Sequence, residues 1–343
     1  MNITLYTIIM ALATGISTFL STFFLIRFAK KYHIYDYPGR RKIQTKPIPT
    51  MGGIAIFLNF WFFYFYSFRS FDQARIAIFI ASAIILLTGI IDDRYDLSPL
   101  KKSIGIILAS LVAFYGGNVR ISTMTLPFVG YISLGFFSLL ITVLWLFLIT
   151  NAVNLMDGLD GLASGISMIA LMTMGTIGYI FSSDGSVLAL AGIILLWSAI
   201  AGFFPHNFFP AKIYLGDTGA LFIGFMIAVF SLNNLKNATF FTMIIPFAVL
   251  GVPISDSVAA IFRRLMRKEP ISRADKAHLH HRLLRLGFSH KQAVLLIFGL
   301  CLIFSLTALI FPISPIIGGI LLVVGLICGG VLYWLSIRER KEK

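Results

Sequence analysis

Apolar segments without charge recur along this chain of 343 residues and restrict its fold more than any other feature. A helix of about 20 apolar residues, with a range of about 17–25, is long enough to span a membrane. The chain is 58% hydrophobic and only 12% charged, whereas soluble domains are about 45–50% apolar and about 25% charged. The composition therefore predicts an all-α polytopic membrane protein.

Eleven segments are candidate transmembrane helices, and we expect them to form one integral-membrane domain that covers residues 1–343. The third and fourth candidates are short, so they are expected to tilt or to end in polar residues. No internal repeat or low-complexity linker divides the chain. The candidates are 4–26, 52–68, 76–91, 104–117, 136–153, 161–181, 186–204, 218–235, 239–262, 292–311 and 314–337.

The placement of Lys and Arg predicts the orientation, because cytoplasmic loops of membrane proteins are enriched in these residues. If the N-terminus lies outside, the inner segments contain all but four of the 28 Lys and Arg residues, and the C-terminus is cytoplasmic. The net charge of +14 therefore does not indicate nucleic-acid binding. The basic loops are expected to face anionic headgroups and anionic substrates. The four outer basic residues are Arg69, Arg75, Arg120 and Lys236.

Three smaller features complete this topology. The uncharged residues 1–26 lack the positive start of a cleaved signal peptide. Residues 118–135 alternate loosely around Pro127 and Gly130, which predicts a small external β-hairpin. Cys301 and Cys328 lie in apolar runs, so neither a disulfide framework nor a zinc site is expected.

Ionisable residues gather at the inner ends of the apolar segments. Ionisable groups in or near a membrane cost free energy, so their presence indicates a functional site. The first cluster, Asp92 and Asp93, ends the run 76–91. Adjacent carboxylates repel each other unless a cation or a basic group lies between them. A solvated helix end is the alternative, but acids at a helix C-terminus oppose the macrodipole. The pattern therefore favours a site.

The second cluster follows the uncharged run Phe136–Thr150 and contains two amides, two carboxylates and two glycines. Asp157 and Asp160 are three residues apart, so they would share one face of a helical turn. Two nearby carboxylates suit a divalent cation, and such a cation suits phosphate chemistry. Asp160 has an alternative role as the N-cap of the next helix. The two amides are those of Asn151 and Asn154.

The third cluster extends from Asn207 to Gly219. Lys212 is the only Lys or Arg in this loop. Tyr214 could stack on a base, although an interfacial anchor is the alternative. Asp217 stands where the next helix begins, which suits either an N-cap or the binding of an anion and its metal.

The fourth cluster lies in the long basic loop and contains His278, His280, His281 and Arg282. Three His in four residues suggest zinc, but no Cys lies nearby. Histidine and arginine together indicate a diphosphate clamp. A basic amphipathic helix on the membrane surface is the alternative.

The fifth cluster runs from Arg40 to Gly53 and ends in Pro-Ile-Pro-Thr-Met-Gly-Gly. Basic residues at a membrane edge often serve only topology. The Pro-x-Pro-Thr-x-Gly-Gly pattern is equally consistent with substrate contact by Thr50 and Gly52.

Together these clusters resemble the polyprenyl-phosphate N-acetylhexosamine-1-phosphate transferase family over essentially the whole chain. The resemblance is carried by six motifs in order, all on one predicted membrane face. The His-Leu-His-His-Arg-Leu stretch looks like the WecA/TagO branch rather than the MraY branch. The motifs are Pro-x-Pro-Thr-Met-Gly-Gly at 47–53, Asp-Asp at 92–93, Asn-x-x-Asn-x-x-Asp-Gly-x-Asp-Gly-Leu at 151–162, Asn207 with Pro-Ala-Lys at 210–212, Gly-Asp-x-Gly at 216–219 and His-x-His-His-Arg at 278–282.

The resemblance implies transfer of N-acetylglucosamine 1-phosphate from UDP-N-acetylglucosamine to undecaprenyl phosphate, with release of UMP. It implies an active site on the cytoplasmic face of the bacterial inner membrane, and a product that feeds a cell-envelope glycopolymer such as teichoic acid or O-antigen. Relatives of this kind also suggest a homodimer. Ala220 departs from the family pattern, where Ser is frequent, and is expected to tune activity.

The resemblance also implies roles for individual residues. Asp217 and Asp92 would hold Mg²⁺, for which Mn²⁺ is a substitute, and Asp92 and Asp93 would orient the acceptor phosphate. Tyr214 would stack on uracil. The expected substrate-binding residues are Asn151, Asn154, Asp157, Asp160, Asn207, Lys212, Tyr214, His278, His280, His281, Arg282, Thr50 and Gly52.

Three other functions compete with this interpretation. A sister transferase would use another UDP-HexNAc or UDP-MurNAc-pentapeptide, and the sequence discriminates poorly against it. A non-catalytic lipid-phosphate transporter would place polar groups near the bilayer midplane, whereas here they lie at helix ends. A CDP-alcohol phosphotransferase has Ala-Arg after its first Asp-Gly. In this chain Leu159-Asp160 follows Asp157-Gly158, which disfavours that class.

Overall fold

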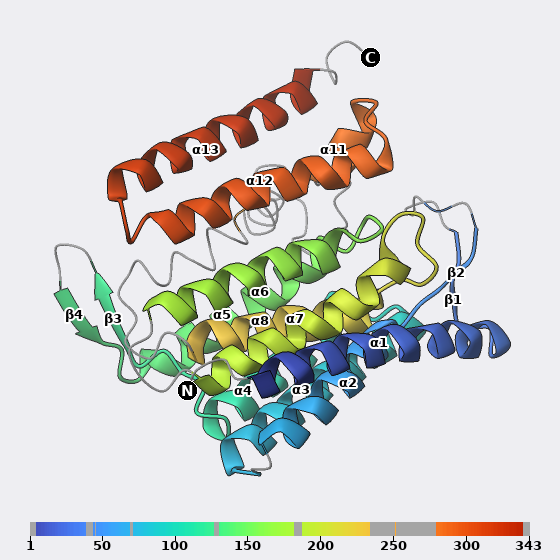
Figure 1. Ribbon diagram of the computed structural model, residues 1–343, viewed down its shortest axis with the longest axis horizontal. Helices are drawn as coiled ribbons and strands as arrows, with labels where there is room; N and C mark the ends of the chain where they lie inside the picture. Colours follow the sequence, from blue (N-terminus) through green and yellow to red (C-terminus); the bar gives the residue numbers. More distant parts are fainter. Residues whose placement is uncertain are drawn as a thin grey trace.

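The computed structural model is a bundle of helices that lie side by side (Figure 1). It describes residues 5–38, 44, 46–68, 71–126, 130–181, 187–233, 251 and 279–338. The predicted span 239–262, apart from residue 251, and His278 lie outside the described residues. The helices are α1 Leu5–Lys31, α2 Gly53–Phe68, α3 Gln73–Tyr95, α4 Pro99–Tyr115, α5 Phe137–Leu155, α6 Leu162–Phe181, α7 Val187–Asn207, α8 Gly216–Asn233, α11 Leu279–Arg285, α12 His290–Ile310 and α13 Pro315–Arg338.

The described helices confirm the prediction of an all-α polytopic membrane protein. Seven of them are long and apolar enough to cross a membrane, and α2 and α8 are shorter apolar helices. Each predicted span other than 239–262 corresponds to one described helix. The predicted bounds are wrong where polar residues continue a helix: α3 extends through Asp92 and Asp93, and α4 begins at Pro99 rather than at residue 104.

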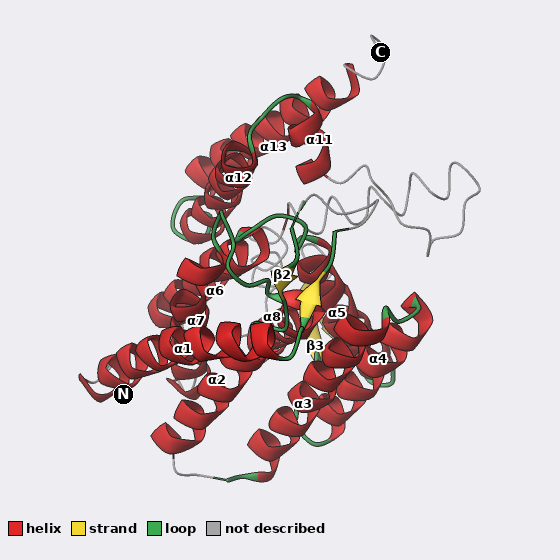
Figure 2. Cartoon of the chain, turned by 90° about the vertical axis from the view of Figure 1, so that its right-hand side faces the viewer, coloured by secondary structure: helices red, strands yellow, loops and turns green. Residues whose placement is uncertain are grey.

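Helix α8 is the centre of the bundle. It packs against α2, α3, α5, α6 and α7, and Figure 2 shows it enclosed by other helices. Residues 218–232 of α8 are all buried. A helix that is surrounded on every side needs apolar residues on every side, which explains the uninterrupted apolar run after Gly219.

Glycines let neighbouring helices approach α8 at its first turn. A Cβ atom on Gly53 of α2 would overlap the backbone of Gly219, and one on Gly89 of α3 would overlap the backbone of Thr218. Close backbone approach at small residues is the usual way in which membrane helices pack. Gly53 and Gly219 therefore allow α2 and α8 to pack closely, and Gly89 does the same for α3 and α8.

Polar residues inside the bundle bind to nearby groups. Thr14, Thr18 and Thr22 of α1 are buried, and each donates a hydrogen bond to the carbonyl oxygen four residues earlier. Asn59 of α2 accepts a hydrogen bond from Ser17 and donates one to Ser21. Such pairing removes the cost of polar groups at membrane depth.

Two short antiparallel pairs of strands lie at opposite ends of the bundle (Figure 1). Strands β3, Thr123–Leu126, and β4, Gly130–Ser133, form the hairpin that was predicted near 118–135. Strands β1, Tyr35–Asp36, and β2, Ile48–Pro49, form a pair that the sequence did not predict. This second pair brings Asp36 beside the Pro-x-Pro-Thr motif.

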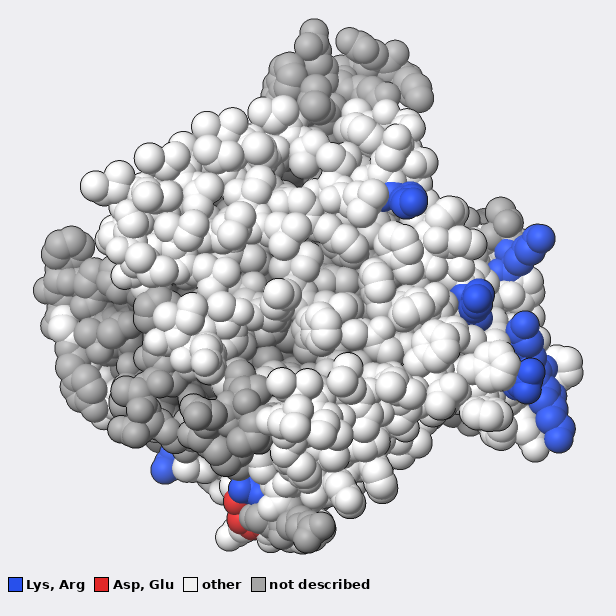
Figure 3. Space-filling view, viewed as in Figure 1, with Lys and Arg blue, Asp and Glu red and all other residues white. Residues whose placement is uncertain are grey.

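Basic residues gather at the end of the bundle that carries β1 and β2. Figure 3 shows the visible Lys and Arg side chains mainly at this end, while the sides of the helices are free of them. Helix α1 ends there with Lys30 and Lys31. The distribution agrees with the predicted asymmetry of charge; the orientation in the membrane stays a prediction.

We predict that Gly53→Ala lowers the free energy of unfolding by about 1–3 kcal/mol, because the added methyl group overpacks the contact with Gly219. Thermal unfolding in detergent measures this change. Gly299→Ala in α12 is the control, because a Cβ atom there meets nothing within 4 Å. Equal melting temperatures for Gly53→Ala and the wild type would contradict the packing role.

Candidate active site

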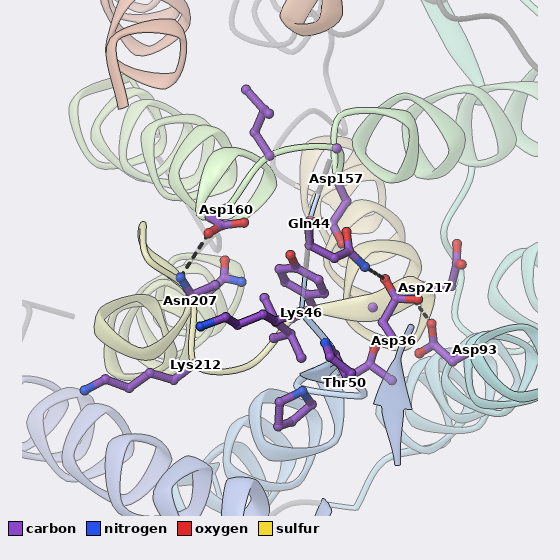
Figure 4. Close-up of a pocket in the computed structure, with 18 of the residues that line it drawn as sticks. Asp36, Gln44, Lys46, Thr50, Asp93, Asp157, Asp160, Asn207, Lys212 and Asp217 are labelled. Carbon is purple, nitrogen blue, oxygen red and sulfur yellow. Dashed lines mark hydrogen bonds between the residues drawn. The ribbon is translucent and has the colours of Figure 1, made fainter. Parts of the chain in front are cut away.

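A cavity of about 970 Å³ lies at the end of the bundle where α1, α3, α5 and α7 end and α8 begins. Figure 4 shows side chains from these separate segments pointing into it. The cavity brings together most of the residues that the sequence predicted. These are Thr50, Asp92, Asp93, Asn154, Asp157, Asp160, Asn207, Lys212, Tyr214, Asp217 and His281.

Lys102 of α4 joins the carboxylates of this cavity. Its Nζ atom lies 2.5 Å from Asp92 Oδ2 and 2.6 Å from Asp217 Oδ1. It also donates a hydrogen bond of 3.2 Å to Asn154 Oδ1, while Asn154 Nδ2 donates one of 2.5 Å to Asp217 Oδ1. A single ammonium group on the first turn of α4 therefore contacts the ends of α3 and α5 and the beginning of α8.

Lys102 was not among the predicted site residues, because residues 92–103 were expected to form a loop whose basic residues serve topology. A helix-start signal was present, since Pro99 follows Ser98 and proline favours the first position of a helix. Starting α4 at Pro99 places Lys102 in its first turn, on the side that faces Asp92.

Asp93 caps the N-terminus of α8 from a distance of 125 residues in sequence. Its carboxylate accepts the N–H groups of Asp217, at 2.8 Å, and of Thr218, at 3.1 Å, and also the hydroxyl group of Thr218. A negative charge is favourable at this end of a helix. The N-cap role considered for Asp217 is therefore taken by Asp93, and the Asp217 side chain faces Lys102 and Asn154.

Gly216 fits between the cap and the Pro-x-Pro-Thr segment. Its φ angle is +71°, and a Cβ atom there would meet both Asp93 and the hydroxyl group of Thr50. Glycine tolerates this left-handed conformation, whereas other residues are strained by it. Both the backbone conformation and the lack of space for a side chain thus require glycine at the first position of the Gly-Asp-Thr-Gly motif.

The Asp157–Asp160 turn forms another wall. Asp160 Oδ2 accepts the N–H of Ala211 at 2.9 Å, and the Asp160 N–H donates to His290 Nε2 at 2.8 Å. Asp160 therefore holds the 209–212 loop and does not cap α6, which begins at Leu162. Burial, reinforced by the charges of Asp217 and Asp93, raises the pKa of Asp157 well above its usual value.

The loop after α7 pairs with the Pro-x-Pro-Thr segment. The Tyr214 N–H donates to the Pro49 carbonyl at 2.8 Å, and the Gly52 N–H donates to the Tyr214 carbonyl at 3.0 Å. Burial raises the pKa of Tyr214, so its phenol group stays protonated. Asn207 is almost fully buried and supports the loop by donating to the Ile213 carbonyl at 3.1 Å.

Several predicted residues do not line the cavity. Asn151 donates to the Phe147 carbonyl within its own helix, at 2.8 Å. Gly52 packs against the ring of Phe203, which a Cβ atom at this position would overlap. His280 and Arg282 are buried in α11, and the His280 ring lies against Gly158. Asn151 is thus bound within its own helix, and Gly52, His280 and Arg282 are buried outside the cavity lining.

The cavity has further lining residues that the sequence analysis did not single out for chemistry. Figure 4 shows Lys46 and Lys212 on one side of the cavity, and Asp93 and Asp217 on the other. Asp36 accepts a hydrogen bond of 2.6 Å from Gln44. A cavity that is lined by both carboxylates and ammonium groups suits a ligand that carries both phosphate groups and a metal ion. The added residues are Lys30, Asp36, Gln44, Lys46, Asp96 and His290.

Oxygen atoms suitable for a hard cation surround the Lys102 ammonium. Among the described residues, no group of three His, Cys, Asp or Glu side chains is close enough to enclose a metal ion. Mg²⁺ does not need such an enclosure, because it usually binds one or two carboxylates together with water and substrate phosphates. Asp92, Asp217 and the Asn154 amide are the residues that fit this requirement.

Comparisons with known proteins identify relatives of this chain. The model of glycosyl transferase family 4 matches residues 75–234, which contain all but the first two residues of α3 and all of α4 to α8. The chain is 39% identical to the probable undecaprenyl-phosphate N-acetylglucosaminyl 1-phosphate transferase of Bacillus subtilis, over 84% of this chain and 80% of the relative. The chain belongs to glycosyl transferase family 4.

Two further family 4 relatives show similar coverage. The decaprenyl-phosphate N-acetylglucosaminephosphotransferase of Mycobacterium leprae is 34% identical, over 84% of this chain and 80% of the relative. The undecaprenyl-phosphate alpha-N-acetylglucosaminyl 1-phosphate transferase of Escherichia coli O157:H7 is 28% identical, over 82% of this chain and 78% of the relative. The matched family region contains Asp92, Asp93, Asn154 and Asp217.

We predict that Lys102→Met lowers the melting temperature in detergent, because Asp92 and Asp217 lose the positive charge between them. The expected loss of stability is about 1–3 kcal/mol, since the carboxylates become unsatisfied. Mg²⁺ should restore more stability to this variant than to the wild type, because the ion can replace the ammonium.

Lys101→Met is the matched control for this experiment. Lys101 adjoins Lys102 but is exposed, so its removal should change stability by less than about 0.5 kcal/mol. An unchanged melting temperature for Lys102→Met would refute the role of the ammonium group.

Proposed function

We propose that this protein transfers N-acetylglucosamine 1-phosphate from UDP-N-acetylglucosamine to a polyprenyl phosphate. The lipid phosphate attacks the β-phosphorus, the bond to the bridging oxygen breaks, and UMP leaves. The observation that carries the proposal is a cavity at one end of a membrane bundle, in which Asp92, Asp93 and Asp217 meet basic side chains. Lys102 pairs with two of these carboxylates. The named activities of the family 4 relatives support it.

The acceptor that we propose is undecaprenyl phosphate. The Bacillus subtilis and Escherichia coli relatives are named as undecaprenyl-phosphate transferases, and the bundle of apolar helices suits a membrane-bound acceptor. We further propose that the reaction takes place on the cytoplasmic face of the bacterial inner membrane. The concentration of Lys and Arg at the end of the bundle that holds the cavity supports this orientation.

Asp92 and Lys102 would position the acceptor phosphate. A phosphate monoester has a second pKa of about 6, so it is largely ionised near pH 7 and needs no strong base. Asp92 is held in place by the Leu97 N–H, at 2.8 Å, and by Lys102. Phosphoryl transfer depends mainly on such positioning and on charge neutralisation, which favours a single displacement over a covalent phospho-enzyme.

The Asp157–Asp160 turn and Tyr214 would bind the nucleotide. The phenol ring can stack on uracil, and stacking on an aromatic side chain contributes about 1–3 kcal/mol per base. Burial raises the pKa of Asp157, which lines this cavity and would contact the base. Lys212 and His281, which line the same cavity, would bind the diphosphate.

Mg²⁺ is the cofactor that we propose, with Mn²⁺ as a substitute. Asp217 and Asp92 would hold it, because their carboxylates already flank a cation, the ammonium of Lys102. When bound, the ion would neutralise negative charge on the donor diphosphate. Lys102 would then balance the remaining charge of the two carboxylates.

A transfer assay tests the proposed function directly. Purified protein is incubated with undecaprenyl phosphate and each of a panel of tritiated UDP-sugars, and label is measured in the organic phase. Transfer from UDP-N-acetylglucosamine alone supports the proposal. Transfer only from another UDP-HexNAc would identify a sister transferase, and no transfer from any donor would refute the proposal.

We predict that Asp217→Asn lowers kcat at least about a hundredfold, which is typical when one stabilising group is removed from a phosphoryl or acyl transfer site. The amide keeps the shape of the side chain and removes its charge, so the protein should stay folded. Asp72→Asn at the start of α3 is the control, since Asp72 is exposed and distant from the cavity. Near-normal turnover by Asp217→Asn would exclude the metal role.

We predict that Tyr214→Leu raises KM for UDP-N-acetylglucosamine about tenfold, because about 1–3 kcal/mol of stacking is lost. The KM for the lipid should not change. Tyr214→Phe keeps the ring and should bind the donor almost normally. If both variants have the wild-type KM for the donor, Tyr214 does not stack on the base.

A further inference from the structure

His290 connects the C-terminal helices to the wall of the cavity. It is the first residue of α12, directly after Ser289, whose side chain caps this helix. Its side chain is only 14% exposed, and it lines the cavity. None of the motifs that indicated function contains His290, and α12 lies outside the region matched by the family model.

The His290 ring contacts two different loops. Its Nε2 atom accepts the backbone N–H of Asp160 at 2.8 Å. Its face stacks on Phe209, with ring centroids 4.7 Å apart and an angle of 25° between the planes. Because Nε2 accepts a hydrogen bond, the proton of the neutral ring resides on Nδ1.

These contacts close a connected chain around one side of the cavity. Asp160 is bound to His290 through its N–H and to Ala211 through its carboxylate. Phe209 and Ala211 belong to the same loop, which leads into Tyr214. One imidazole therefore sets the distance between the Asp157–Asp160 turn and the Tyr214 loop.

The acidic centre lies outside this chain of contacts. Lys102 is bound to Asp92, Asp217 and Asn154, and among the described residues no hydrogen bond or ion pair joins this group to His290. A change at His290 should consequently alter the shape of the donor pocket and leave the acceptor side intact.

We propose that His290 is a positioning residue for the UDP-sugar, which acts by holding two nucleotide-binding loops at a fixed separation. The inference rests on the proposed function, because it assigns those loops to the donor. It extends the site to the C-terminal helices, which pack mainly on α6 at the edge of the bundle (Figure 2).

Steady-state kinetics of three variants test the proposal. His290→Ala removes the acceptor and the ring, His290→Phe keeps a ring that can stack, and His290→Gln keeps an oxygen that can accept the Asp160 N–H. We expect His290→Ala to raise KM for UDP-N-acetylglucosamine about tenfold, which corresponds to about 1.4 kcal/mol. The other two variants should show smaller increases, because each keeps one contact.

KM distinguishes positioning from a merely structural role, because a smaller folded fraction lowers apparent kcat without changing KM. The KM for undecaprenyl phosphate should stay within about twofold of the wild type for all variants, since each tenfold change needs about 1.4 kcal/mol. Lys291→Ala is the matched control, because Lys291 is the exposed neighbour of His290.

Three results would overturn the proposal: an unchanged donor KM in every variant, a loss of kcat alone, or a rise in the lipid KM instead. If His290→Ala does not fold, the Phe and Gln variants still decide the question through their donor KM. Failure of the proposed function is distinguishable, since the wild type itself would then transfer no sugar phosphate from UDP-N-acetylglucosamine.

Discussion

The pairing of Lys102 with Asp92 and Asp217 is the interaction on which the site depends. Charges at the edge of a membrane are costly unless opposite charges neutralise them. Lys102 and Asp217 are 115 residues apart in sequence, yet their side chains lie 2.6 Å apart. Satisfying these charges requires the end of α3 and the beginnings of α4 and α8 to meet at one place, beside the cavity.

Close helix packing makes this charge pairing geometrically accessible. Gly53, Gly89 and Gly219 allow α2 and α3 to approach the first turn of α8. This approach brings Asp93 within hydrogen-bond distance of the α8 N-terminus and leaves the adjacent Asp92 facing Lys102. The two neighbouring carboxylates therefore have different partners: one stabilises a helix end, and the other faces the cavity beside Asp217. A site of this kind positions charges on helix ends, where the scaffold holds them rigidly.

Loops rather than helix ends form the opposite side of the cavity. The Asp157–Asp160 turn, the loop that leads to Tyr214 and the start of α12 are joined by hydrogen bonds and by the stacked rings of Phe209 and His290. This division separates a rigid acidic centre from a pocket whose shape depends on contacts between loops. It matches the needs of a transferase that neutralises phosphate charge on one side and recognises a nucleotide on the other.

Local composition alone determined the membrane-spanning helices, the hairpin near 118–135 and the clustering of Asp92, Asp157 and Asp217 at one end, because span length and charge placement are encoded within each segment. Only the tertiary structure decided the partners of the side chains. It assigned Asp93 to the cap of α8, paired Lys102 with Asp92 and Asp217, and added His290 to the cavity. The physical reason is that these contacts depend on how distant helices rotate and pack, which no local pattern specifies.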